Sequence, residues 1–191
     1  MNDRLVRRED LVLVIVDVQE KLAAAMERRA EVVAAAVRLI RLAELVGAPI
    51  VVTRQYPDGL GDTVAGIGEA LASAAATVPV VTVDKLAFCA CAEPAFAEAM
   101  RATGRSQAVV AGMESHICVT QTALELAGLG TEVHVVADAC CSRRSCDHDV
   151  AMDRLRSAGV VVTTSESVMY ETVAVAGTNE FKRLLSIVKG A

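Results

Sequence analysis

Short apolar runs alternate along the chain with longer segments of helical spacing. Leu11–Val18 is an almost continuous apolar run, which is typical of a strand buried on both faces of a sheet. The following segment, Glu27–Val46, has the spacing of an amphipathic helix. Its predicted buried face includes Val33, Val37 and Ile40. The first unit of the chain is therefore predicted to be a strand followed by a helix.

The same alternation continues to the end of the sequence. Further strands are predicted at Pro49–Thr53, Val78–Val83, Gln107–Ala111, Glu132–Val136 and Val160–Thr163. Further helices are predicted at Ile67–Ala76, Glu93–Thr103, Cys118–Leu126 and Asp147–Ser157, with two more in Ser165–Ala191 and a loop at Tyr56–Gly61. Six strands that alternate with helices predict one α/β domain over residues 1–191, in which helices cover both faces of a parallel sheet.

Composition and charge narrow the classes of function. Hydrophobic residues make up 53% of the 191 residues, but aromatic residues only 3%, which argues against a stacking platform for single-stranded nucleic acid. Acidic residues outnumber basic ones by 24 to 19, and no basic stripe is present, so we expect no nucleic-acid partner. The apolar runs are too short to cross a membrane and the first residues do not resemble a signal peptide. We therefore expect a cytoplasmic protein.

The six cysteines do not form a recognisable disulfide or zinc pattern. Cys89 and Cys91 are one residue apart, and Cys140 and Cys141 are adjacent. Paired C-x2-C motifs are absent, and a cytoplasmic chain with a large core has little need of disulfides. Dinucleotide and phosphate-loop motifs are also absent, so we expect no metal and no cofactor. A thiol redox sensor at Cys118 or at the Cys140–Cys141 pair is a further alternative.

Three reactive side chains follow predicted strands at their carboxyl ends, where open parallel sheets bind ligands. Asp17 ends the first apolar run, Lys85 follows the third strand, and Cys118 follows the fourth at the start of a helix. A helix N-terminus and a nearby ammonium are expected to lower the pKa of a thiol. A carboxylate beside the thiol can accept its proton and later protonate a leaving amine. Taken singly, each residue also fits an ordinary role as a turn, solvated or packing residue.

The segments around these residues resemble the isochorismatase-like cysteine hydrolases, and in particular the isochorismatase domain-containing subgroup. The resemblance covers nearly the whole chain. It is carried by Val14–Gln19, Val51–Val64, Asp84–Cys89, Val109–Leu126, Val133–Arg143 and Thr163–Glu171.

The resemblance implies a catalytic triad. Cys118 is then the nucleophile, Asp17 the general base and Lys85 the cation that stabilises the thiolate. A cis peptide bond between Met113 and Glu114 is also implied, with the N–H groups of Glu114 and Cys118 as an oxyanion hole. The implied sheet has six strands in the order 3-2-1-4-5-6. The third strand is then not adjacent to the first, so Lys85 is expected to reach Asp17 through its loop.

Differences within the family narrow the expected reaction. Nicotinamidases of the family bind a metal through histidines after the second strand, whereas here no histidine precedes His116. Isochorismatases proper lack the cysteine, so Cys118 favours metal-independent hydrolysis of a C–N bond in a small amide, ureide or carbamoyl compound. The reaction would pass through a covalent acyl intermediate. Expected substrate-binding residues are Gln19, Gln55, Tyr56 and His116.

A catalytically silent binding or scaffold protein of the same fold is the alternative, because fold does not determine function. A homo-oligomer is expected from the resemblance. The C-terminal apolar stripe supports that expectation if the chain itself does not cover it; it consists of Phe181, Leu184, Leu185 and Val188.

Overall fold

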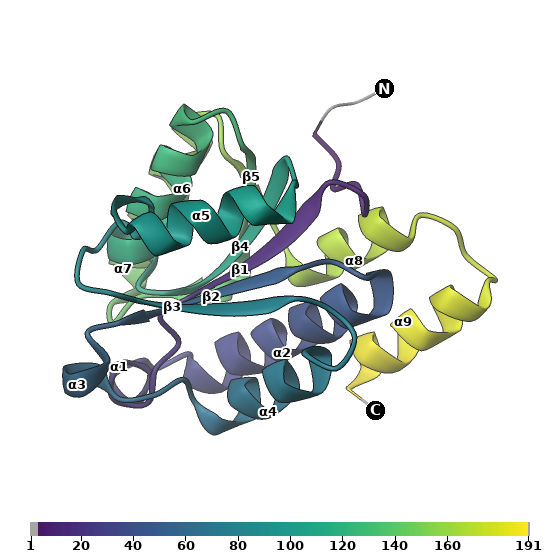
Figure 1. Cartoon of the computed structure of the whole chain (residues 1–191), viewed down its shortest axis with the longest axis horizontal. Helices are drawn as coiled ribbons and strands as arrows, with labels where there is room; N and C mark the ends of the chain where they lie inside the picture. The colour runs from purple at the N-terminus through teal and green to yellow at the C-terminus, as the bar shows by residue number, and fades with distance from the viewer. Residues whose placement is uncertain (1–3, 191) are drawn as a thin grey trace.

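The computed structural model describes residues 4–190, which form a parallel sheet between two layers of helices (Figure 1). The strands lie in the order β3-β2-β1-β4-β5-β6, and all neighbouring pairs are parallel. This confirms the expected three-layer α/β architecture and strand order. The strands are β1 (Leu11–Val16), β2 (Ile50–Gln55), β3 (Val80–Lys85), β4 (Gln107–Met113), β5 (Glu132–Cys141) and β6 (Val161–Thr163).

Helices cover both faces of the sheet, with more helices on one face than on the other. Helices α2, α4, α8 and α9 pack on one face, and α5, α6 and α7 on the other (Figure 1). The helices are α1 (Glu20–Ala24), α2 (Arg29–Val46), α3 (Pro57–Leu60), α4 (Ala65–Ala74), α5 (Pro94–Thr103), α6 (Thr120–Gly128), α7 (Ser145–Ser157), α8 (Ser165–Val173) and α9 (Asn179–Lys189). A 3-10 turn, η1 (Ala90–Ala92), and a π-helical turn, η2 (Ser115–Val119), complete the chain.

The central strand β1 separates two hydrophobic cores. Leu11, Leu13 and Ile15 pack with α2 and α4, whereas Val12 and Val14 pack with α5 and α6. Successive side chains of a strand point to opposite faces, so one continuous apolar run supplies both cores. Each fully buried aliphatic side chain contributes about 1.5–3 kcal/mol relative to exposure, and this burial keeps the strand ends in fixed positions.

Several elements differ from the expectations. The buried face of α2 is centred on Val32 and Leu39, while Val33 and Val37 are only partly buried. Helices α1 and α3 were not expected, because five and four residues are too few to show helical periodicity. Strand β5 continues to Cys141, beyond the expected end at Val136.

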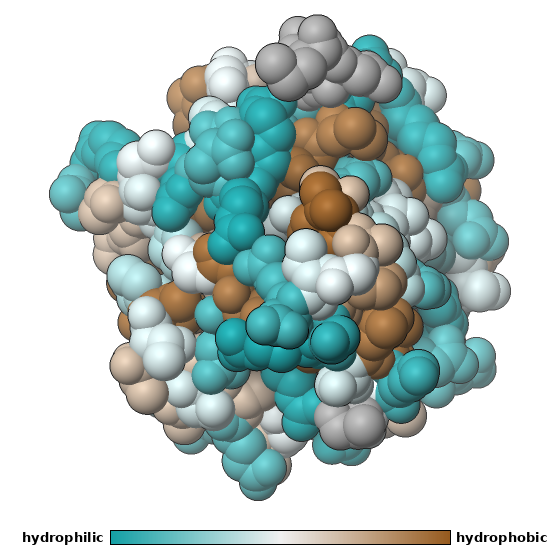
Figure 2. Space-filling model, turned by 90° about the vertical axis from the view of Figure 1, so that its right-hand side faces the viewer, coloured by the Kyte–Doolittle hydropathy of each residue, from teal (hydrophilic) through white to brown (hydrophobic). Residues whose placement is uncertain are grey.

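The C-terminal apolar stripe is largely covered within the chain. Leu184 is fully buried, and Phe181 and Val188 pack on the same core as α2 and α8. Figure 2 shows the face that carries α8 and α9, where apolar side chains are interspersed with hydrophilic ones. The stripe therefore gives no support to the expected oligomer. Within residues 4–190, no helix combines the length and the apolar character needed to span a bilayer.

Candidate active site

Asp17 and Lys85 form a fully buried ion pair at the carboxyl end of the sheet. Lys85 Nζ lies 2.7 Å from Asp17 Oδ2, and neither side chain is exposed. Asp17 directly follows β1 with a φ of 52°, a region that short polar residues tolerate better than others. The hydroxyl of Thr53, on β2, donates a hydrogen bond to Asp17 Oδ1 at 2.6 Å. The carboxylate is therefore held by a charge on one oxygen and a hydrogen bond on the other.

Lys85 reaches Asp17 across the end of β2. It is the last residue of β3 and is in register with Gln55, the last residue of β2. Its Nζ donates to Gln55 Oε1 at 2.6 Å and to the carbonyl oxygens of Ala87 and Phe88 at 3.2 Å each. The expectation that a loop brings Lys85 to Asp17 is wrong, because the strand end places the residue and the loop supplies only acceptors.

Lys85 Nζ has three hydrogen-bond acceptors besides its ion-pair partner: Gln55 Oε1 and the carbonyl oxygens of Ala87 and Phe88. Asp17 Oδ2 consequently lies against the ammonium but accepts no well-aligned hydrogen bond from residues 4–190. A buried carboxylate oxygen without a hydrogen bond is rare, since buried polar atoms are normally hydrogen-bonded. Asp17 Oδ2 therefore keeps its acceptor capacity for a proton from another group.

The third predicted triad residue, Cys118, lies in η2 between β4 and α6 and is only 5% exposed. Burial, and then the charge of Asp17, raise the pKa of its thiol to about 12, against the opposing charge of Lys85. The expectation of a lowered pKa at this cysteine is therefore wrong. At neutral pH the thiol is protonated, and its proton must leave as the sulfur reacts.

The chain between β4 and Cys118 has an unusual backbone. Gly112 has a φ of 140°, and a Cβ there would lie 2.0 Å from the carbonyl oxygen of Val16, so only glycine fits. The Met113–Glu114 peptide bond is cis, as expected. The Glu114 carboxylate accepts hydrogen bonds from the Arg143 N–H at 2.8 Å and Nε at 3.2 Å. The Glu114 N–H, in contrast, finds no acceptor within residues 4–190 and is available to a ligand.

Two predicted substrate-binding residues, Gln19 and Gln55, have hydrogen-bond partners within the protein. Gln19 Nε2 donates to the carbonyl oxygens of Gln55 and Gly61, at 3.0 and 2.7 Å, and its Oε1 accepts from the Gln55 N–H. The side chain of Gln55 accepts from Lys85 and donates to the carbonyl oxygen of Leu86. All these amide atoms are engaged inside the protein. Gln19 fixes the ends of β1 and β2, and Gln55 positions Lys85.

The other two predicted residues lie on segments next to the triad. Tyr56 follows Gln55, is 51% exposed, and its ring lies where a Cβ on Gly59 would clash at 2.3 Å. His116 lies in η2 and its Nδ1 is 2.9 Å from Ser142 Oγ. Both remain candidates for contact with a substrate, since neither is enclosed by protein polar groups on all sides.

Cys140 and Cys141 are not placed to form a disulfide with one another. Both are buried in β5, but Cys140 belongs to the core beneath α5–α7 and Cys141 to the core beneath α2. Their side chains point to opposite faces of the sheet, as consecutive strand residues do. The redox alternative based on this pair is therefore wrong.

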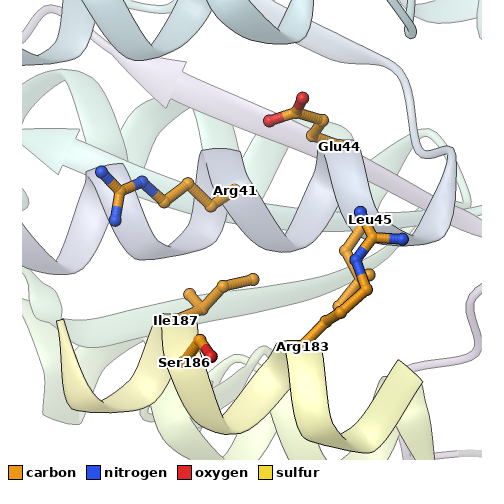
Figure 3. Close-up of a pocket in the computed structure, with 6 residues that line it drawn as sticks. All are labelled: Arg41, Glu44, Leu45, Arg183, Ser186 and Ile187. Carbon is orange, nitrogen blue, oxygen red and sulfur yellow. The ribbon is translucent and has the colours of Figure 1, made fainter. Parts of the chain in front are cut away.

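Other polar groups and hollows lie apart from the triad. In the part of the chain that the structure describes, no three His, Cys, Asp or Glu side chains are grouped as metal ligands. A groove of about 360 Å³ runs between α2 and α9 (Figure 3) and is lined by Arg41, Glu44, Leu45, Arg183, Ser186 and Ile187. No triad residue lines this groove, so its position does not suggest a role in chemistry at Cys118.

Comparison with known proteins adds independent findings. Residues 11–167 match the family model described as Isochorismatase domain. Isochorismatase domain-containing protein 2A of Mus musculus is 35% identical over 182 residues, which cover 95% of this chain and 84% of the relative. Isochorismatase domain-containing protein 1 of Danio rerio is 37% identical over 173 residues, or 91% of this chain. The match spans only 59% of that relative's length.

A solved structure is similar over nearly the whole fold. The structure named MAR1 ribonuclease from Caenorhabditis elegans has a TM-score of 0.88 and 30% sequence identity, with 97% of this chain and 92% of that chain covered. The same six-stranded α/β arrangement is therefore shared by a protein of experimentally determined structure.

Proposed function

Because the chain belongs to the isochorismatase domain family of hydrolases, we propose that it is a metal-independent cysteine hydrolase. Its substrate would be a small amide, ureide or carbamoyl compound, and the bond broken would be a C–N bond. The observation that carries the proposal is the buried Asp17–Lys85 ion pair, whose two charges both act on the Cys118 thiol. Carboxylate, ammonium and thiol come from three separate parts of the chain and meet at the carboxyl end of the sheet.

In the first half of the reaction, Cys118 Sγ attacks the carbonyl carbon while its proton moves to Asp17 Oδ2. The raised pKa of the thiol requires this coupling, because a free thiolate is scarce at neutral pH. The N–H groups of Glu114 and Cys118 would hold the oxyanion of the tetrahedral intermediate. When the intermediate collapses, Asp17 returns the proton to the departing nitrogen, and an acyl group remains on Cys118 as a thioester.

In the second half, water replaces the departed amine. Asp17 takes a proton from the water as its oxygen attacks the thioester carbonyl, and the C–S bond then breaks to release a carboxylic or carbamic acid. The proton passes from Asp17 to the sulfur and restores the thiol. Lys85 remains charged throughout and balances the negative charge that moves between the carboxylate and the sulfur.

The chain around β2 supports chemistry without a metal. Arg54 precedes Gln55 on β2. It forms an ion pair with Asp84, in which Arg54 Nε lies 2.7 Å from Asp84 Oδ1. Gln55 in turn binds Lys85. Neither an arginine nor a glutamine amide whose atoms are already hydrogen-bonded is a typical ligand for a catalytic metal such as zinc.

A substrate panel with trapping of the acyl-enzyme tests the proposal. The panel contains small primary amides, ureides and carbamoyl compounds, with RNA included because a relative is named a ribonuclease. We expect one of the small compounds to be hydrolysed, Cys118→Ala to abolish turnover, and mass spectrometry of quenched reactions to show an acyl group on Cys118. Cys146→Ser is the matched control, because Cys146 is an exposed cysteine on α7. Full activity of Cys118→Ala, or cleavage of RNA alone, contradicts the mechanism.

The second candidate function is a catalytically silent binding protein, and one observation favours it. Asp17, Lys85 and Cys118 are exposed by only 0%, 2% and 5%, so the three side chains offer a substrate little accessible surface. The discriminating result is turnover: a silent protein would bind a ligand near Cys118 and release it unchanged.

We also propose a homo-oligomer. Leu86 and Phe88, on the loop after β3, are 72% and 56% exposed, which is unusual for large apolar side chains of a monomer when they occur together. Sedimentation of the full chain at micromolar concentration tests this, and a single species of 20.0 kDa contradicts it.

A further inference from the structure

Outside the triad, the structure places two thiols side by side. Cys89 Sγ donates to the carbonyl oxygen of Gln121 at 3.6 Å, and Cys91 Sγ to that of Thr122 at 3.9 Å. These acceptors are consecutive residues of α6, so both sulfur atoms lie over the same short stretch of helix. Burial raises the pKa of Cys91 to about 12, and the charge of Cys89 raises it further. Both thiols therefore lie against the same turn of α6.

The backbone between them suits a direct bond. Ala90 is the first residue of the 3-10 turn η1, so the Cα atoms of Cys89 and Cys91 are closer than the roughly 7 Å that two extended residues span. Disulfides normally join Cα atoms separated by about 4.4–6.8 Å. Both cysteines are partly exposed. Cys91 also lines a groove of about 440 Å³, mostly apolar, between α5 and α6, which gives a small molecule access to this thiol.

The thiol pair adjoins the loop that holds Lys85. Phe88 immediately precedes Cys89, and the carbonyl oxygens of Ala87 and Phe88 accept hydrogen bonds from Lys85 Nζ. Glu93, at the start of α5, holds the same loop from outside through the N–H groups of Leu86 and Ala87, at 3.1 and 3.4 Å. A change in the backbone at Cys89 therefore acts on the neighbouring residue Phe88, whose carbonyl oxygen accepts a hydrogen bond from Lys85 Nζ.

We propose that Cys89 and Cys91 form a thiol–disulfide exchange site for small disulfides, and that closing this site displaces Lys85. The thiolate of Cys89 attacks the small disulfide, forms a mixed disulfide and expels one thiolate. Cys91 then attacks the Cys89 sulfur of that mixed disulfide, loses its proton as it does so, and expels the second thiolate. Two protein thiols are oxidised, one small disulfide is reduced to two thiols, and the two protein protons end on the released thiols.

Closure changes the surroundings of the triad through the chain itself. The new S–S bond takes both sulfur atoms away from the carbonyl oxygens of Gln121 and Thr122 and turns the backbone at Cys89. The Phe88 carbonyl moves with it, so Lys85 loses one of its acceptors. Since the charge of Lys85 favours the thiolate of Cys118, its displacement makes Cys118 less reactive.

Oxidised glutathione tests the proposal on the full chain. The protein carries Cys146→Ser throughout, because Cys146 is exposed and would react on its own account. We expect peptide mapping to show a Cys89–Cys91 disulfide without bound glutathione. We also expect the rate of Cys118 alkylation by iodoacetamide at constant pH to fall about tenfold, the effect of one pKa unit, and to recover after reduction with dithiothreitol. Neither readout depends on hydrolase activity.

Cys91→Ser in the same background is the matched control. This variant lacks the second thiol, so it is expected to stop at glutathione bound to Cys89. Circular dichroism verifies that it folds. The exchange site is contradicted if Cys89 and Cys91 remain free thiols in the presence of excess oxidised glutathione, or if the disulfide maps elsewhere. The link to Lys85 is contradicted if the disulfide forms and Cys118 alkylation is unchanged.

Discussion

The carboxyl end of the sheet buries Asp17 against Lys85 at 2.7 Å, whereas the amino end buries His134 with its Nε2 at 3.3 Å from Glu132 Oε1. In both places an acidic and a basic group lie within ion-pair distance beneath the same strands. Burial lowers the pKa of His134 even though Glu132 opposes this. The histidine is therefore neutral at pH 7, and neither of its ring nitrogens has a hydrogen-bond partner within residues 4–190.

The difference shows that burial of ionisable groups is not enough to make a reactive site. At the amino end, Glu132 is held by a second polar group, because Gln107 Nε2 donates to Glu132 Oε2 at 2.8 Å. At the carboxyl end, a thiol lies under the influence of both charges, and Asp17 Oδ2, although paired with Lys85, accepts no hydrogen bond from residues 4–190. The arrangement of open acceptor and protonated thiol, rather than burial, points to chemistry.

The largest effect is expected from removing the cation of the buried pair. Lys85→Met leaves the Asp17 carboxylate buried without its partner, and we expect the free energy of unfolding to fall by about 3–5 kcal/mol. Urea unfolding measures it. The double variant Asp17→Asn/Lys85→Met removes both charges and should regain part of the loss. A double variant no more stable than Lys85→Met would show that the charges do not depend on one another.

A smaller effect is expected from Gln55→Leu. This change removes the acceptor at 2.6 Å from Lys85 Nζ and leaves a buried ammonium proton unsatisfied, at a cost of about 1–3 kcal/mol. Urea unfolding again gives the loss, and reduced Cys118 alkylation would reveal the misplaced ammonium. His116→Gln is a useful comparison, because it changes a polar side chain near Cys118 that does not contact Lys85. Equal loss in both variants would argue against a positioning role for Gln55.

Asp17→Asn separates the two effects that Asp17 has on the thiol. Its negative charge raises the pKa of Cys118, so the substitution is expected to lower that pKa and to increase alkylation at pH 8 by about tenfold, one pKa unit. Turnover is nevertheless expected to disappear, because the amide cannot accept the proton. A pH series of iodoacetamide labelling gives the pKa. Slower labelling of Asp17→Asn than of the parent protein is the contrary result.

The smallest effect is expected at the amino end. Because the pKa of His134 is lowered in the folded protein, the unfolded chain binds a proton at higher pH than the folded chain. The stabilisation is fully present above about pH 6.5, the ordinary pKa of histidine, and is lost as the pH falls below it. The slope from one group is at most about 1.4 kcal/mol per pH unit.

His134→Leu is expected to flatten this slope in urea unfolding between pH 7 and 5 (a range that spans about pH 6.5). His148, whose pKa is also lowered by burial, should keep its own contribution. An unchanged slope would mean that His134 does not titrate with unfolding.

The sequence pattern predicts the sheet well because the strands are nearly uninterrupted apolar runs. Leu11–Val18 and the later runs identify the strands, and the right-handed connections of parallel sheets restrict their arrangement. The pattern fails where a segment is short, as at α1, or where polar residues continue a strand. Asp138 interrupts the apolar run of β5, and the register shift opposite Val110 and Gly112 cannot be seen from spacing alone.

The candidate site was predictable in its reactive residues but not in its supports. Asp17 and Lys85 are recognisable in the sequence as charged residues at the ends of apolar runs. Cys118 is recognisable from the motif around it. The contact between Lys85 and Asp17 crosses an intervening strand, so no local spacing reveals it. The roles of Gln19 and Gln55 likewise depend on which neighbouring atoms form hydrogen bonds with their side-chain amides, and the sequence does not show these partners. The raised pKa of Cys118 is caused mainly by burial. The sequence shows only a helix start and a lysine, which by themselves predict a lowered pKa.

The π-helical turn at Ser115–Val119 also constrains how this protein can change its length. A π turn is an α-helical turn with one residue added, and each α-helical residue advances by about 100° around the axis. Deleting one residue there would remove the extra residue and leave α6, which begins at Thr120, in phase with its apolar face. The passage from β4 to α6 is thus specified by a residue count as well as by residue types, and a single in-frame deletion would alter it even if every cysteine remained in the gene.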